Sequence, residues 1–84
     1  MTEKRVALVT GASSGIGKTI VRRLLAEGWT VYAGARRVEK MEDIRSEGAR
    51  IVPLDVTVEA SLRHAMQTLL AAEGRIDALV NNAG

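Results

Sequence analysis

The chain has 84 residues, of which 46% are hydrophobic and 26% are charged, as expected of one small globular domain and not of a disordered segment. The net charge is only +2 at pH 7 and aromatic residues make up 2%, so no basic, base-stacking surface is indicated and we expect no nucleic-acid partner. Because the chain has no cysteine, we expect no thiolate metal site. No apolar run approaches about 20 residues, so we expect no membrane span. No leader pattern precedes the first apolar run, and we expect a cytoplasmic location.

The first predicted unit is a strand, a glycine-rich turn and a helix. Residues 5–10 form a nearly continuous apolar run, which is typical of a strand covered on both faces. Residues 10–17 then read Thr-Gly-Ala-Ser-Ser-Gly-Ile-Gly. The helix that follows is expected to end before Gly28 and to turn one apolar face inward, formed by Ile16, Ile20, Val21 and Leu24.

The glycines of this turn are spaced as Gly-x-x-x-Gly-x-Gly, which predicts a phosphate-binding loop. Gly11 permits a sharp strand-to-helix turn, Gly15 leaves space for a pyrophosphate, and Gly17 lets the helix lie close to the sheet. Free N–H groups and the positive end of the helix dipole favour an anion there. Ser13 and Ser14 add hydroxyl groups that either contact the anion or cap the helix.

The rest of the chain continues to alternate strands and helices. The pattern predicts strands over residues 30–35, 50–54 and 76–80, a short helix over 38–47, and a third helix that begins with Thr57 as its N-cap and ends at Gly74. Pro53 cannot donate a hydrogen bond to a central ladder, so its strand should lie at a sheet edge. The helix residues expected to face inward are Met41, Ile44, Leu62, Met66, Leu69 and Leu70.

Strands separated by helices predict an α/β fold with parallel strands and right-handed crossovers. The order β-α-β-α-β-α-β predicts a Rossmann-type doubly wound parallel sheet, first half only, with the strand order 3-2-1-4. The last strand has an apolar edge at residues 78–80, which a further strand would normally cover. We therefore interpret residues 1–84 as one half domain.

The residues after the second strand indicate which dinucleotide is bound. In dinucleotide-binding folds an acidic residue near this place binds the 2′-hydroxyl of NAD(H). The chain instead has Ala35 followed by Arg36 and Arg37, whose guanidinium groups can hold a 2′-phosphate through bidentate hydrogen bonds. We therefore predict that NADP(H) is preferred over NAD(H). The alternative is that Arg36 and Arg37 are solvated loop residues, which fits Arg37 better than Arg36.

Asp55 follows the third strand, where its carboxylate can accept a hydrogen bond from the adenine amino group while the backbone of Val56 covers the ring edge. The alternative is that Asp55 is a turn residue ahead of Thr57. His64 is the only histidine, lies off the inward face of the third helix and is expected to be a surface residue.

The chain closely resembles the short-chain dehydrogenase/reductase family. The family pattern Thr-Gly-x-x-x-Gly-x-Gly is present at residues 10–17, the aspartate after the third strand is Asp55, and Asn-Asn-Ala-Gly after the fourth strand is present at residues 81–84. All three motifs occur in order and at family-like spacing, so the resemblance covers the whole chain.

The resemblance also implies residue roles. The pyrophosphate and the adenosine ribose would be lined by Gly11, Ser13, Gly15 and Ile16. Arg36 occupies the basic position of NADP-preferring members, and Asp55 and Val56 would meet adenine. The segment that would pass beneath the adenosine ribose consists of Asn82, Ala83 and Gly84, and Asn81 or Asn82 would also tie the central strands together.

The family's catalytic groups, a Tyr-x-x-x-Lys pair with a serine, follow the segment that this chain covers. The only tyrosine, Tyr32, lies inside the second strand, so we assign no catalytic residue. The resemblance implies that the intact protein is an NADP(H)-dependent oxidoreductase, which transfers hydride between the nicotinamide cofactor and a carbonyl or alcohol substrate, and we expect it to form a homo-oligomer. The 84 residues alone would bind cofactor without activity. The alternative is a non-catalytic module that binds a nucleotide or self-associates through the edge at residues 78–80.

Overall fold

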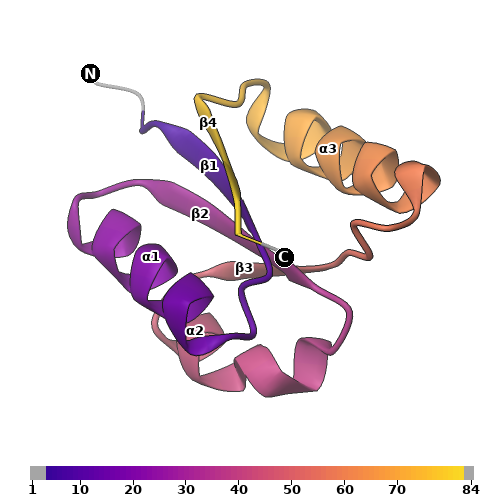
Figure 1. Ribbon diagram of the computed structural model, residues 1–84. Coiled ribbons are helices and arrows are strands. Elements are labelled where there is room, and N and C mark those ends of the chain that lie inside the picture. Colours follow the sequence, from indigo (N-terminus) through magenta and orange to yellow (C-terminus); the bar gives the residue numbers. More distant parts are fainter. Residues whose placement is uncertain (1–3, 83–84) are drawn as a thin grey trace.

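The structure of the protein is a computed structural model that describes residues 4–82. Its centre is a parallel sheet in the order β3-β2-β1-β4, formed by β1 (Val6–Thr10), β2 (Thr30–Ala35), β3 (Arg50–Pro53) and β4 (Ala78–Asn81) (Figure 1). The predicted strand order is confirmed. Pro53 lies in the edge strand β3, where its missing N–H costs no ladder hydrogen bond.

The helices cover both faces of the sheet (Figure 1). On one face, α1 (Gly15–Ala26), the 3-10 turn η1 (Val38–Met41) and α2 (Glu42–Ser46) contribute to a core with Val9 and Ala33. On the other face, α3 (Glu59–Glu73) packs on a second core built around Leu8 and Tyr32. Neighbouring residues of each strand therefore point to opposite layers, as strand geometry requires.

The helix predicted over residues 38–47 is divided into η1 and α2. Neither segment has a side-chain cap, and the first turn of a short, uncapped helix readily tightens into 3-10 geometry. The inward residues are those predicted, because Met41 and Ile44 are both fully buried in the core of this face.

Thr57 is not the N-cap of α3, which corrects the sequence prediction. Its N–H and its hydroxyl both donate to Oδ1 of Asp55, at 3.0 and 2.6 Å, and Val58 occupies the N-cap position without a side-chain hydrogen bond. Thr57 lies one residue before the N-cap position, and its hydroxyl is already bonded to the carboxylate of Asp55. The local turn at Asp55 therefore forms in place of a threonine cap on α3.

Two residues predicted to face inward are exposed instead. Ile16 is 71% exposed and Leu70 is 42% exposed. The buried faces are centred on Val21 in α1 and on Leu69 in α3, and Leu70 lies about 100° around the helix from its neighbour Leu69. Among the described residues, no helix combines the length and the apolar character needed to cross a membrane.

Candidate functional site

A cavity of about 460 Å³ opens where the parallel strands end, and its wall comes from the loops after β1, β2, β3 and β4. Ligands of open α/β sheets bind at this edge, next to the point where the strand order reverses. Here the reversal lies at β1, which pairs with β2 on one side and with β4 on the other. The residues that line the cavity are Gly11, Ser13, Ser14, Ala35, Arg36, Leu54, Asp55, Val56, Thr57 and Asn82.

Most of the predicted site residues lie in this wall. Those that the structure brings together are Gly11, Ser13, Ser14, Arg36, Asp55, Val56 and Asn82. The predicted residues Gly15, Ile16 and Arg37 do not line it. Ala83 and Gly84 lie outside the described residues. The wall also contains three residues that were not predicted as site residues, namely Ala35, Leu54 and Thr57. Ala35 ends β2 and Leu54 directly follows β3, so their places at strand ends could have indicated them.

The loop between β1 and α1 has the geometry of an anion-binding turn. Gly11 adopts φ +63°, which a residue with a side chain rarely takes, and the turn leads directly to the N-terminus of α1. Ser14 is the N-cap: its hydroxyl accepts from the N–H of Gly17 at 3.1 Å and donates to the carbonyl of Gly11 at 3.0 Å. The capping alternative therefore holds for Ser14. Within residues 4–82 the hydroxyl of Ser13 makes no hydrogen bond, so it is available to a ligand.

Gly17 holds α1 against the loop at a distance that only glycine allows. A Cβ atom on Gly17 would collide with the carbonyl oxygen of Gly11 and lie 2.8 Å from Cα of Ala12. This confirms the predicted role of Gly17 in close packing. By contrast, a Cβ atom on Gly15 would meet no heavy atom within 4 Å, so that position faces open space.

The end of β4 is tied to the glycine-rich loop through Asn82. Its side-chain amide donates to the carbonyl of Gly11 and to the hydroxyl of Ser14, both at 3.2 Å. Its backbone N–H donates to the hydroxyl of Thr10 at 3.0 Å, and that hydroxyl donates to Oδ1 of Asn81 at 3.1 Å. Both asparagines therefore join β4 to β1, whereas the prediction named one or the other.

Asp55 and Arg36 bring opposite charges into the cavity wall. The hydrogen bonds from the hydroxyl and the N–H of Thr57 hold the pKa of Asp55 below its usual range, and the nearby charge of Arg36 lowers it further. Asp55 is therefore ionised at neutral pH. The turn alternative for Asp55 holds, and the same residue also lines the cavity.

Arg36 and Arg37 differ in placement although they are adjacent in sequence. Arg36 leaves β2 at the cavity wall, whereas Arg37 occupies the N-cap position of η1 with an exposed side chain. Of these two guanidinium groups, only that of Arg36 belongs to a residue of the cavity wall. The solvated alternative fits Arg37.

Tyr32 lies away from this site. Its side chain is buried beneath α3, and its hydroxyl donates to Oε2 of Glu73 at 2.7 Å. Burial raises the pKa of Tyr32, and the hydrogen bond to Glu73 raises it further. A tyrosine whose proton is held in this way is a poor donor, which agrees with its predicted non-catalytic role.

A family model described as short chain dehydrogenase matches residues 5–84. The chain therefore belongs to the short chain dehydrogenase family. Its parallel sheet, its glycine-rich loop and the cavity at the strand ends have the arrangement of a Rossmann-type α/β fold.

Curated and solved relatives support this assignment. An acetoacetyl-CoA reductase from Acinetobacter sp. (strain RA3849) is 43% identical over 94 residues, which covers 100% of this chain and 37% of that reductase. The structure of a metagenomic short-chain oxidoreductase in complex with NADP has a TM-score of 0.82 at 41% identity and covers 95% of this chain and 39% of that one. A 3-ketoacyl-(acyl-carrier-protein) reductase from Brucella melitensis, complexed with NADH, has a TM-score of 0.89 at 36% identity and covers 98% of this chain and 35% of that one.

The chain spans about a third of the length of the curated relatives that it matches, between 29% and 37% of each. Of the two solved relatives, the metagenomic oxidoreductase carries NADP and the Brucella melitensis reductase carries NADH.

Proposed function

We propose that this chain supplies the cofactor-binding segment of an NADP(H)-dependent oxidoreductase, which transfers hydride between the cofactor and a carbonyl or alcohol substrate. The observation that carries the proposal is the cavity at the strand ends, whose wall combines the glycine-rich loop with Arg36 and Asp55. Family membership supports the reaction class. Because relatives bind NADP or NADH, the preference for NADP(H) rests on Arg36.

The described residues fit such a cofactor. The cavity volume of about 460 Å³ lies within the range of small-molecule sites, roughly 300–1,000 Å³. The N-terminus of α1 and the hydroxyl of Ser13 offer donors to a phosphate, while the carboxylate of Asp55 offers an acceptor to the adenine amino group. Arg36 provides a cation at the end of β2, and a guanidinium binds phosphate more strongly than a neutral donor does.

A bound nicotinamide cofactor would donate the hydride in its reduced form or accept it in its oxidised form. The residues of this chain bind and orient its adenosine and phosphate groups. We propose that residues 1–84 form an NADP(H)-binding half domain and that the catalytic groups of the whole protein come from sequence beyond it. The 84 residues by themselves are then inactive. A homo-oligomeric state and a cytoplasmic location remain predictions from the sequence.

The test is to titrate the full-length protein with NADPH and with NADH and to repeat both titrations with Arg36→Gln. A hydrogen bond to a charged group contributes about 1.5–3 kcal/mol, so we expect Arg36→Gln to weaken NADPH about 10- to 100-fold and to leave NADH nearly unchanged. Arg37→Gln removes the same charge beside the cavity and is the matched control. Equal affinity for the two cofactors in the unaltered protein would contradict the NADP(H) assignment, and binding of neither would contradict the proposed function.

A second candidate function is self-association through β4. Leu79 is 50% exposed and lies on this edge strand, whose outer side pairs with no other strand among residues 4–82. An unpaired apolar edge can template pairing with a second chain. Sedimentation of the 84-residue chain distinguishes the candidates: a discrete folded dimer would favour this module, whereas aggregation would favour a cofactor-binding segment that needs further sequence.

A further inference from the structure

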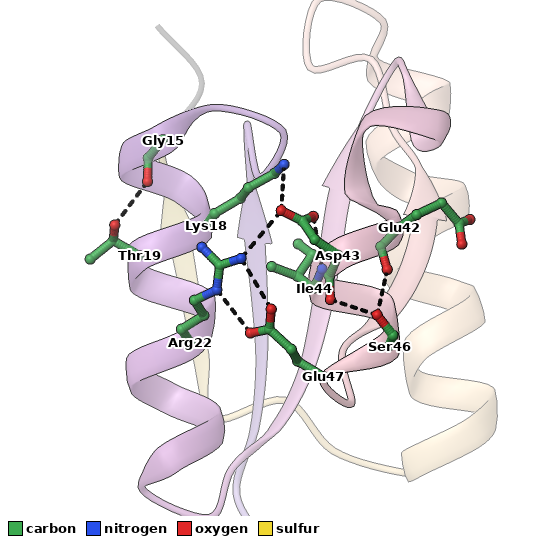
Figure 2. Close-up of polar contacts among 9 residues, drawn as sticks. All are labelled: Gly15, Lys18, Thr19, Arg22, Glu42, Asp43, Ile44, Ser46 and Glu47. Carbon is green, nitrogen blue, oxygen red and sulfur yellow. Dashed lines mark hydrogen bonds and ion pairs between the residues drawn. The ribbon is translucent and has the colours of Figure 1, made fainter.

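An ion-pair clamp, made by Lys18 and Arg22 of α1 and Asp43 and Glu47 of the α2 region, joins the two helices (Figure 2). Oδ2 of Asp43 accepts from Nζ of Lys18 at 3.0 Å and from Nη2 of Arg22 at 3.2 Å. The two carboxylate oxygens of Glu47 accept from Nε and Nη2 of Arg22 at 2.8 and 3.1 Å. Asp43 therefore sits at the centre of the clamp and contacts both cations.

The helix that the clamp holds is too short to place itself. α2 has five residues, whereas isolated helices below about 12 residues are marginal in water. Two apolar side chains, Met41 and Ile44, fix its depth in the core. Both side chains lie on the side of α2 that faces the core. The clamp adds the polar contacts that fix the orientation of α2 against α1.

The clamp also limits the connector from β2 to α2, residues 36–40, which begins with the cavity residue Arg36. All five connector residues are exposed. Within residues 4–82 none of their side chains forms a hydrogen bond or an ion pair with another residue. Apart from the attraction between Arg36 and Asp55, the path of the connector depends on its two ends, which are the ladder of β2 and the position of Met41 with α2.

The other end of the clamp belongs to the phosphate-binding turn. The N–H of Lys18 donates to the carbonyl of Ser14 at 2.9 Å, so Lys18 lies in the first turn of α1. The clamp thus connects the N-terminus of α1 to the connector that carries Arg36. These two elements approach the cavity from different sides.

We propose that Asp43 is a positioning residue for cofactor choice: through Lys18 and Arg22 it fixes the connector so that Arg36 faces the cavity. This inference rests on the proposed function, because it concerns the guanidinium assigned to the 2′-phosphate. Loss of the clamp lets α2 and the connector sample more positions. The affinity for a cofactor that carries the 2′-phosphate then falls. The affinity for a cofactor without the 2′-phosphate does not change, because that cofactor does not use Arg36.

The experiment compares Asp43→Asn with Glu42→Gln in the full-length protein. Both changes remove one negative charge from α2, but within residues 4–82 the side chain of Glu42 pairs only with Arg45 of the same helix, at 3.2 Å. We expect Asp43→Asn to weaken NADPH by roughly fivefold, the size expected for partly exposed ion pairs, and to change NADH by less than about twofold. Glu42→Gln should change neither cofactor. Equal weakening of both cofactors by Asp43→Asn, or no weakening of NADPH, would overturn the inference.

Two further measurements separate this inference from the proposed function. If Arg36→Gln abolishes the NADPH preference while Asp43→Asn does not reduce it, only the positioning role fails. If Arg36→Gln leaves the preference intact, the assignment of Arg36 to the 2′-phosphate fails, and the positioning role of Asp43 fails with it. Hydrogen exchange tests the positioning role without any cofactor. The amide of Lys40 donates to the carbonyl of Arg37 at 3.1 Å, within the connector. This amide should exchange faster in Asp43→Asn than in Glu42→Gln. Identical exchange in the two variants would refute the positioning role whatever the cofactor results.

Discussion

Replacing Gly17 by alanine tests how closely α1 must approach the glycine-rich loop. The new Cβ atom would collide with the carbonyl oxygen of Gly11 and lie 2.8 Å from Cα of Ala12. Both neighbours are backbone atoms of a turn that is held by β1 and β2, so neither can rotate away as a side chain could. The helix or the loop has to move instead.

The expected cost follows from two opposing effects. Overpacking costs about 1–3 kcal/mol, and rigid backbone neighbours place Gly17→Ala at the upper end of that range. Alanine is the better helix former by about 1 kcal/mol, which offsets part of the cost. The free energy of unfolding should therefore fall by about 2 kcal/mol, which corresponds to roughly 8–16 °C in Tm for a domain of this size.

Gly15→Ala is the matched control, because it introduces the same methyl group in the same helix where no heavy atom lies within 4 Å. Urea denaturation of both variants provides the measurement. We expect Gly15→Ala to be as stable as the unaltered protein, or more stable by up to about 1 kcal/mol. The reasoning is refuted if Gly17→Ala unfolds at the same urea concentration as Gly15→Ala.

Two further predictions concern the joints of the sheet. Thr10→Val keeps the side-chain shape but leaves the N–H of Asn82 without its acceptor, so urea denaturation should show a loss of about 1–3 kcal/mol. Asp77 accepts from Arg75 and from the N–H of Val6, and these hydrogen bonds, with the arginine bond the larger cause, lower its pKa. Stability from Asp77 is therefore present above its unfolded pKa and is lost as the pH falls through the lower folded value. Thermal unfolding from pH 7 to pH 2 should show a shallower acid loss for Asp77→Asn, and an unchanged profile would contradict this assignment.

The strand order was predictable because several local signals agree. The apolar runs, the glycine stops and the proline in β3 each favour the same arrangement, so one doubtful signal does not alter the topology. One error falls where two local structures compete. Thr57 is a good N-cap by type, but the turn at Asp55 uses its hydroxyl first.

The candidate site was predictable as far as it follows from strand ends. Arg36 and Asn82 come directly after a strand and Asp55 comes two residues after one, and parallel strands bring those ends together. The placement of Arg37 outside the cavity depends on η1, whose 3-10 geometry has no distinct sequence signal. The clamp could not be predicted, because its pairs lie 21 and 25 residues apart and surface charges carry no information about their partners.

The tie between Asn82 and Gly11 has a consequence for the order of events during synthesis. The two residues are 71 positions apart, so Gly11 emerges from the ribosome long before its partner exists. Domains generally fold during translation as their sequence becomes available, and distant contacts form only after the intervening chain has been ordered. A nascent chain halted before β4 therefore presents the glycine-rich loop without the amide that braces it. Nucleotide binding by ribosome-bound chains of increasing length should thus begin only when Asn82 has left the exit tunnel.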